Sequence, residues 1–296
     1  MQASTVVYKK KPRRFRRFVL ILLALLLLIA GAGATFLFAT QPTGVRHYLL
    51  VGKDSWEGLT PSEKGRTDVM MLVTLDFEAN RILLTSFLRD TLVRMPKGNQ
   101  NRLNTIAQWY GDDALRKYLE DTYNIRIDGM FCLNFWGAIR VVDALGGVTV
   151  DLTRAEVAYL RRTFPAPKYT LYDGLCKLSG AQALEYMRCR KLDNDFGRTN
   201  RQSNVMKALM QEMSGVSLEK ALLLVPELGG FFTTDLSLTE QLALTRDAYT
   251  LRNARVDHHQ VPASGTFSFS KLGSMSVLKI DQEKNKQLLE AFWTGR

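Results

Sequence analysis

Short runs of apolar residues dominate the first half of the chain after its N-terminal segment, and they predict strands. HYLLVG at 47–52 is one run of strand length, and residues 67–96 contain two or three more. The tetrapeptide FEAN at 77–80 is typical of a hairpin turn between two of them. Because these runs are almost continuously apolar, we expect a sheet that is covered on both faces.

Further along the chain, apolar residues recur three and four positions apart, which predicts amphipathic helices. We expect strands at 131–136 and 148–152, a helix capped by Ser179, and further helices at 104–111, 113–123, 137–147, 198–213, after 214 and at the C-terminus. Strands and helices therefore alternate. This pattern predicts an α/β domain with helices on both faces of the sheet.

The N-terminal segment has a different pattern. Residues 19–39 contain no charged side chain, and a helix of this length spans the roughly 30 Å apolar core of a bilayer. Seven Lys and Arg residues and no acids lie in 1–18. We therefore expect a basic cytoplasmic tail (1–18), a single-pass transmembrane helix (19–39), a linker (40–46) and an extracellular domain (47–296) in the cell membrane. A cleaved signal peptide is the alternative, although its apolar region is usually shorter.

Charge and cysteine content narrow the function only slightly. The net charge is +11, but the basic tail accounts for seven of these charges, so we expect no nucleic-acid partner. Three cysteines, Cys132, Cys176 and Cys189, do not form a disulfide framework. They leave open one bridge or three buried thiols.

Two groups of polar residues follow predicted strands. Asp54 ends the first strand, and Asp68 begins the next one, so adjacent strands can bring both carboxylates to one edge of the sheet. Such a pair suits Mg²⁺, which takes its other ligands from water and substrate phosphates. Strand-end aspartates that only bond the backbone are the alternative. Arg89 and Asp90 end a third apolar strand, where ligands of α/β sheets bind; an exposed ion pair explains them equally well.

A third group lies in RCRKLDNDFGRTNRQ at 188–202. If a helix begins at 198, Arg198, Arg201 and Gln202 share one face of its first turns. The helix dipole disfavours cations there, so a bound polyanion would explain them. Arg188 and Arg190 can close the site from the other side, because the guanidinium fork binds phosphate oxygens in pairs. Asp195 then lies in the loop before the helix. A solvated helix end is the alternative.

These motifs, in this order, resemble the LytR-CpsA-Psr family of bacterial cell-envelope proteins. The matching segments include GKD (52–54), GRTDVMMLVTLD (65–76), LTSFLRDTLVRMP (84–96) and LSGAQALEYMRCRKLDNDFGRTNRQ (178–202). The resemblance implies a three-layer α/β/α sandwich with an apolar channel for a polyprenyl chain. It also implies a phosphotransferase that moves an anionic or capsular glycopolymer, such as teichoic acid or capsular polysaccharide, from an undecaprenyl-pyrophosphate carrier to peptidoglycan with the help of Mg²⁺.

The resemblance also assigns roles to individual residues. The metal ligands would be Asp54 and Asp68, the pyrophosphate ligands Arg89, Arg188, Arg190, Arg198 and Gln202, and the residues that orient these or activate the acceptor Arg66, Asp90, Asp195 and Arg201. The lipid tail is expected among helix faces such as those of Leu115, Leu119, Val141 and Leu145, residues that ordinary core packing also explains. A regulator that binds polyprenyl pyrophosphate without transfer, or a pyrophosphatase, is the alternative function.

Overall fold

The computed structural model describes residues 42–54, 67–166, 168–193 and 195–295, and Thr43–Arg296 forms one compact unit. The expected tail (1–18), the expected membrane span (19–39) and Arg66 lie outside the described residues. Within the described ranges, no helix combines the length and the apolar character needed to cross a bilayer.

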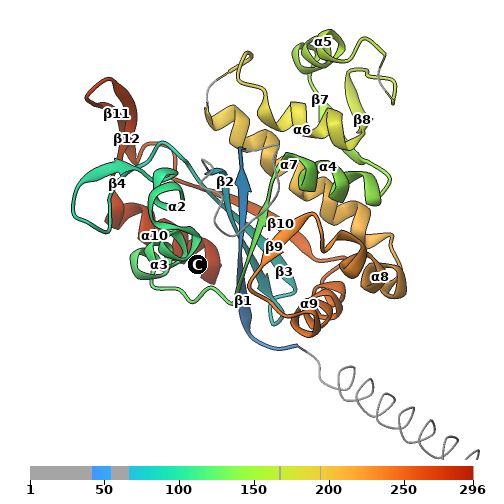
Figure 1. Ribbon diagram of the computed structural model, residues 1–296, viewed down its shortest axis with the longest axis horizontal. Coiled ribbons are helices and arrows are strands. Elements are labelled where there is room, and N and C mark those ends of the chain that lie inside the picture. Colours follow the sequence, from blue (N-terminus) through green and yellow to red (C-terminus); the bar gives the residue numbers. More distant parts are fainter. Residues whose placement is uncertain (1–41, 55–66, 167, 194, 296) are drawn as a thin grey trace, which may run out of the picture. The chain divides into compact units, whose positions relative to one another are not determined.

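A mixed six-stranded sheet forms the centre of this unit (Figure 1). Its strand order is β10 (Arg255–Val261), β3 (Arg81–Phe87), β2 (Thr67–Asp76), β1 (Val45–Lys53), β6 (Gly129–Leu133) and β9 (Phe232–Thr234). The predicted turn at 77–80 joins β2 and β3, which pair antiparallel from Asp76 and Arg81 onwards. β6 ends three residues before its predicted end, because Asn134 accepts a hydrogen bond from Gly137 N and caps the next helix.

The strands bury both faces of the sheet, as their continuous apolar runs predict. Successive side chains of a strand point to opposite faces. Leu49 and Val51 of β1 belong to a core under the first helical layer, whereas Tyr48 and Leu50 pack with residues of the opposite layer.

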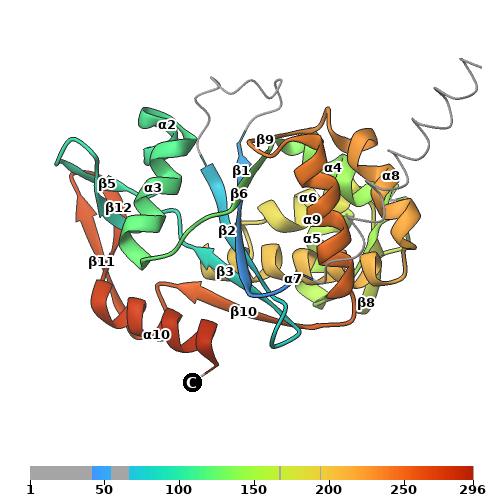
Figure 2. The same ribbon diagram turned by 90° about the horizontal axis from the view of Figure 1, so that it is seen from below.

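Three helices cover the first face: α2 (Thr105–Tyr110), α3 (Asp112–Tyr123) and the C-terminal α10 (Gln282–Thr294). Figure 2 shows them on one side of the sheet, with α4, α8 and α9 on the other. Leu115 and Leu119 of α3 are completely buried in this first core together with strand residues.

The second face is covered by α4 (Phe135–Ala144), α6 (Gly180–Arg188), α7 (Asp195–Ser214), α8 (Leu218–Leu228) and α9 (Leu238–Thr250). The predicted cap of α6 is present, because Ser179 and Gln182 form a reciprocal capping box. α4 and α6 pack so closely that a Cβ on Gly180 would lie 2.3 Å from the carbonyl oxygen of Ile139. The predicted α/β domain with helices on both faces of the sheet is thus confirmed.

In the described part of the chain, three two-stranded sheets flank the two helical layers. The predicted strand at 148–152 is β7 (Val148–Leu152), but it pairs only with β8 (Gly174–Leu178), outside the central sheet, beside α5 (Arg154–Thr163). At the other side, β4 (Leu92–Arg94) pairs with β5 (Gln100–Arg102), and β11 (Phe267–Leu272) pairs with β12 (Met275–Ile280).

Candidate functional site

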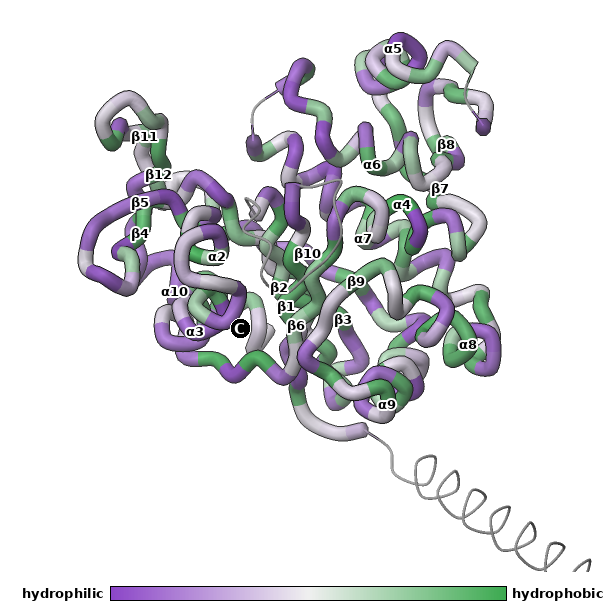
Figure 3. Tube along the Cα trace, in the orientation of Figure 1, coloured by the Kyte–Doolittle hydropathy of each residue, from purple (hydrophilic) through white to green (hydrophobic). Residues whose placement is uncertain are grey.

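A cavity of about 1210 Å³ lies between the central sheet and the second helical layer. This exceeds the usual 300–1,000 Å³ of small-molecule pockets. Its walls are mainly apolar, and Figure 3 shows hydrophobic positions concentrated along the strands and the facing helices. The apolar lining includes Leu50, Val69, Met71, Val73, Phe131, Val141, Leu145, Leu184, Val205, Met206, Leu209, Met210, Met213, Ala221, Leu224, Val225, Leu244 and Ala248.

The cavity separates the four residues expected around a lipid tail into two pairs. Val141 and Leu145 line it from the side of α4. The expectation for Leu115 and Leu119 is wrong, because both side chains are completely buried in the core on the opposite face of the sheet. Equal apolar periodicity in two helices does not show which face of a sheet each helix covers.

The cavity also has polar and charged lining residues, and one group of them forms a rim at one edge of the sheet. Lining residues there are Asp54, Asp68, Arg188, Arg190, Lys191, Arg198 and Gln202. They come from the end of β1, the start of β2, the end of α6 and the first turns of α7. β1 and β2 are antiparallel, and their register shifts between Gly52 and Lys53, so the predicted carboxylate pair lies at the same edge of the sheet.

Asp68 connects three of the predicted arginines. Its Oδ1 accepts a hydrogen bond from Arg89 Nη1 at 2.8 Å, and its Oδ2 accepts one from Arg190 Nη2 at 2.7 Å. Arg198 Nη1 lies 3.8 Å from the same Oδ2. The three arginines come from separate segments, and the fold brings them around one carboxylate.

Arg198 is the most unusual of these cations, because it is only 2% exposed. Its Nε and Nη1 make no hydrogen bond, although Nη2 lies 3.5 Å from Asp195. Burial, and then the charge of Arg89, lower its pKa below the ordinary arginine value. Buried donors without acceptors are costly, and these belong to a side chain that lines the cavity. An anionic ligand would satisfy them.

Arg188 lies at the other side of this rim. Its guanidinium stacks on the ring of Phe135, 4.1 Å from the ring centroid, and its Nη2 lies 3.9 Å from Asp54 Oδ1. The cation–π contact holds the side chain over the start of α4 while its polar edge faces Asp54.

Asp90 and Asp195 form a second carboxylate pair around Arg89. Arg89 Nε donates to Asp195 Oδ2 at 3.1 Å and lies 3.7 Å from Asp90 Oδ2. Burial and a hydrogen bond with Asp195 raise the pKa of Asp90 to about 6. Burial alone would raise the pKa of Asp195, but the Asp90 hydrogen bond and the charges of Arg198 and Arg89 outweigh it and lower that pKa. Asp90 therefore binds a proton as pH falls to about 6, whereas Asp195 binds one only at lower pH.

Arg201 does not line the cavity, so the expectation that it faces a polyanion together with Arg198 and Gln202 is wrong. Its guanidinium is buried and donates to both oxygens of Asp193, at 2.8 and 2.7 Å, and to the carbonyl of Cys189 at 2.7 Å. α7 begins at Asp195, three residues earlier than predicted. On this helix Arg198 and Gln202 face the cavity, and Arg201 points to the α6–α7 connection.

Two further cations at the site were not among the predicted residues. Lys191 lines the cavity rim, and Arg102 of β5 lies 3.1 Å from Asp90 Oδ1 through its Nη1. Lys191 was in the quoted basic segment, so its position was a usable signal. No pattern around Arg102 indicates that a three-residue strand would bring it to Asp90.

The donor chemistry of the rim fits a divalent cation such as Mg²⁺. Asp54 and Asp68 supply hard carboxylate oxygens beside arginines that suit a phosphate, and Mg²⁺ commonly uses one or two carboxylates. Among the described residues, no cluster of three or more His, Cys, Asp or Glu side chains could hold a metal by itself. The three cysteines, all of them described, are buried and unpaired.

Comparison with known proteins agrees with this geometry. Residues 37–292 match the model of the LytR_cpsA_psr family. A polyisoprenyl-teichoic acid–peptidoglycan teichoic acid transferase, TagU of Oceanobacillus iheyensis, is 31% identical over 214 residues, which are 69% of this chain and 63% of the relative. The match thus spans less than two thirds of that relative.

Solved structures share the fold. TagT bound to LIIa-WTA has a TM-score of 0.70 at 24% identity, over 85% of this chain and 90% of that one. The family protein YwtF (TagT) with bound octaprenyl pyrophosphate lipid has a TM-score of 0.66 at 21% identity, over the same shares. With a family model matched over most of its length and a fold shared with solved members, the chain belongs to the LytR_cpsA_psr family.

Proposed function

We propose that this protein transfers an anionic or capsular glycopolymer from an undecaprenyl-pyrophosphate carrier to a hydroxyl of peptidoglycan. The observation that supports this most directly is Arg198, a buried cation with two unpaired donors where a large apolar cavity meets a charged rim. A ligand that fits must combine a long apolar chain with a strongly anionic head. The names of the relatives point to the same class of donor.

The site has an apolar cavity and a charged rim, and these two parts suggest how such a donor would bind. The polyprenyl chain would occupy the apolar cavity, and the pyrophosphate would lie against Arg198, Gln202, Arg188 and Arg190 at its rim. Arg89 does not line the cavity but reaches Asp68 from behind the rim. It would contact the phosphoryl group that is transferred, where charge develops in the transition state.

The transfer itself needs one bond to form and one to break. The acceptor hydroxyl oxygen attacks the phosphorus nearest the polymer, and the bond from this phosphorus to the bridging oxygen breaks, so polyprenyl phosphate leaves with the electron pair. The hydroxyl proton passes to a carboxylate of the Asp90–Asp195 pair. Arg89 holds both carboxylates in place through its contacts with each.

Asp54 and Asp68 are the proposed ligands for Mg²⁺. When bound, this ion would neutralise charge on the phosphate oxygens and favour departure of the polyprenyl phosphate. Residues 19–39 are the proposed membrane anchor, which would keep the site close to the bilayer that holds the donor.

The test is reconstitution of the full chain in detergent with a lipid-pyrophosphate-linked glycopolymer, peptidoglycan and Mg²⁺. We expect transfer by the wild type and at least a hundredfold slower transfer by Arg89→Ala, on the order of the effect of losing one oxyanion donor. Arg126→Ala is the matched control, because that side chain is 87% exposed and contacts only Asp128 among described acids. Release of polyprenyl phosphate without transfer would instead show a pyrophosphatase, and binding without turnover would show a regulator.

A further inference from the structure

The β11–β12 hairpin presents an aromatic side chain to solvent. Phe269 is 75% exposed, more than any other large hydrophobic side chain that the structure describes. Phe267 and Lys271 share its face of β11, because alternate residues of a strand point the same way. A single exposed apolar side chain is common on protein surfaces, so its neighbours decide whether it belongs to a binding surface.

The aromatic side chains of the hairpin continue into the active-site cluster. The rings of Phe269 and Phe267 pack edge to face at 5.6 Å, and the ring of Phe267 stacks on that of Phe196 at 5.0 Å. Phe196 lies in the first turn of α7, directly after Asp195. A row of three rings therefore leads from solvent to the Asp90–Asp195 pair.

The polar contacts of Asp90 also reach the hairpin. Arg102, which pairs with Asp90, donates from its Nε to the carbonyl of Ser276 in β12 at 3.0 Å. Leu278 N donates to the carbonyl of Asp90 at 2.9 Å. The hairpin is thus bonded to one of the two carboxylate residues that we propose as proton acceptors, and these contacts fix its position relative to Asp90.

The geometry of the reaction places the acceptor on the side of the site that faces the β11–β12 hairpin. In phosphoryl transfer the attacking and leaving oxygens are roughly in line. The leaving polyprenyl phosphate would lie in the cavity, so the acceptor hydroxyl must approach from the opposite side of the phosphorus. Arg89, Asp90, Asp195 and Arg102 belong to the cluster, yet none of them lines the cavity. They occupy the side that leads to the hairpin.

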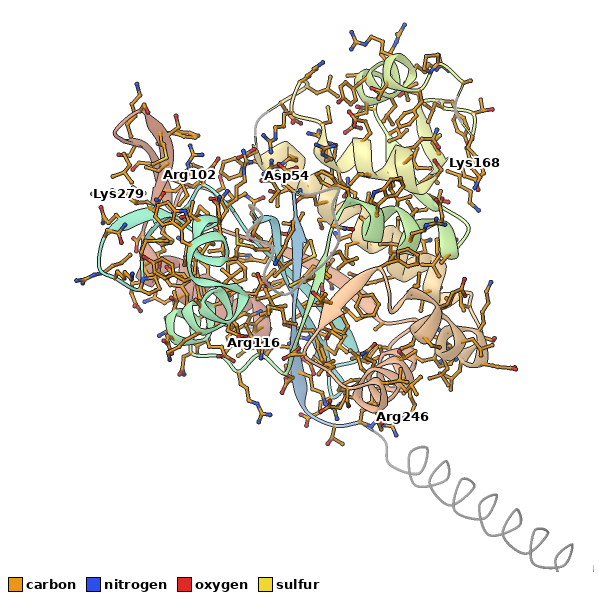
Figure 4. All side chains as sticks on the ribbon, viewed as in Figure 1. Asp54, Arg102, Arg116, Lys168, Arg246 and Lys279 are labelled. Carbon is orange, nitrogen blue, oxygen red and sulfur yellow. The ribbon has the colours of Figure 1, made fainter. Side chains whose placement is uncertain are left out.

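The charge of the hairpin fits the same partner. Lys271 is exposed on the same face of the hairpin as Phe269, whereas Lys279 is exposed on the other face, because it pairs with Ser268 of β11. Figure 4 labels Lys279 at the hairpin, with Arg102 drawn between it and Asp54 in that view. Peptidoglycan combines amino-sugar rings, whose C–H faces pack on aromatic rings, with peptide stems that carry carboxylates. The aromatic rings suit the sugars, and Lys271 suits the stems.

We propose that the β11–β12 hairpin is the docking surface for the saccharide chain of the acceptor, with Phe269 and Phe267 stacking on its sugar rings and guiding a hydroxyl to Asp90. This inference rests on the proposed function, because that function supplies peptidoglycan as the partner that the hairpin would bind.

The test compares Phe269→Ala with wild type, using the full chain in detergent, a lipid-pyrophosphate donor and soluble peptidoglycan fragments. We expect the KM for the fragments to rise about three- to tenfold, as loss of an aromatic contact predicts. The KM for the donor should not change. Phe269→Trp should restore acceptor binding, because it keeps a stacking surface. Leu223→Ala is the matched control, since Leu223 of α8 is 64% exposed and outside the hairpin.

A second measurement separates this inference from the proposed function. Direct binding of the fragments to wild type, followed by NMR or calorimetry, should weaken by the same factor in Phe269→Ala even if no transfer occurs. An unchanged acceptor KM together with unchanged fragment binding would overturn the proposal. So would a loss of binding to phospholipid vesicles, or of self-association, in Phe269→Ala while fragment binding stays intact, because the ring would then contact a membrane or a second copy.

Discussion

At the scale of single residues, two arginines three positions apart on α7 have opposite environments. Arg198 has two buried donors without partners, whereas Arg201 binds both oxygens of Asp193. Buried donors without hydrogen-bond acceptors destabilise a fold, whereas removal of Asp193 or Arg201 from its pair leaves the other charge uncompensated. The same substitution at the two positions should therefore separate binding from stability.

We expect Arg198→Met to bind polyprenyl pyrophosphate about ten- to a hundredfold more weakly, which corresponds to the loss of a charge-assisted hydrogen bond. Its melting temperature should stay the same or rise. Arg201→Met should lower the melting temperature by several degrees. Lipid binding by calorimetry and thermal unfolding of both variants would check this, and a normal lipid affinity of Arg198→Met would contradict the proposed anion site.

The Asp90 carboxyl predicts a pH dependence. Its pKa is raised to about 6, so the proton acceptor is lost as pH falls below 6. We expect kcat/KM for transfer to rise with pH up to about 6 and then to level off, because this ratio reports the free enzyme. Asp90→Asn should be slow and lack the rise. An unchanged profile in Asp90→Asn would assign the titration to another group.

The raised pKa of Asp90 also makes the stability of the folded protein depend on pH. A carboxyl with a raised pKa binds more protons in the folded state than in the unfolded state between its ordinary pKa, near 4, and about 6. Its contribution to the free energy of unfolding is therefore present at low pH and is lost as pH rises through this window. Denaturant titrations at pH 4.5 and 7 should show a smaller difference between Asp90→Asn and wild type at the lower pH.

At the scale of elements, the connection between α6 and α7 sets the position of the cations. Arg201 ties Asp193 and the carbonyl of Cys189 to α7, and Gly197 leaves room for this, because a Cβ there would lie 2.0 Å from Asp193 Oδ2. Asp195 in the first turn of α7 suits the helix dipole. The pocket rim therefore depends on residues that do not touch it.

We expect Gly197→Ala to displace Asp193, loosen the Arg201 contacts and weaken polyprenyl-pyrophosphate binding several-fold, without altering any residue of the rim. Gly215→Ala at the other end of α7 is the matched control, because its Cβ would meet nothing closer than 3.6 Å. Lipid affinity of both variants would be measured under identical conditions. Equal affinities would show that this connection does not position Arg198.

The elements also show what the sequence could predict. Local signals sufficed for β1, for the β2–β3 hairpin and for the capped start of α6, because each depends on nearby residues. The bounds of α7 were missed by one turn, since Asp195–Gly197 do not have an apolar pattern. The family resemblance implied that the motif residues Asp68, Arg89, Arg190 and Arg198 share one site, whereas local patterns could not show this, because their mutual contacts join segments far apart in the chain.

Other features depend on tertiary packing that no local pattern specifies. The cavity is one of them, because Leu115 and Val141 have equally apolar helical surroundings and only the strand order decides which face each one covers. The contact of Arg102 with Asp90 is another, since it follows from a three-residue strand packed beside β12.

At the scale of the whole unit, one side of the sheet is filled by a compact core and the other encloses the cavity. We expect Ala138→Trp, on the cavity wall of α4, to shorten the lipid chain that can bind. Affinity for long polyprenyl pyrophosphates should fall, while that for short ones changes little. Ala79→Trp in the exposed turn after β2 is the control. A uniform loss across all chain lengths would indicate misfolding of α4 instead.

The unpaired donors of Arg198 also bear on turnover. A spent carrier keeps its hydrocarbon chain but retains only one of two phosphates, so it offers fewer oxygens to the same fixed guanidinium groups. After each cycle some of these donors would again lack acceptors, at a free-energy cost. The enzyme would thereby bind its product less tightly than its substrate. Release of the polyprenyl phosphate would be favoured because the transfer has removed one phosphate and its negative charge.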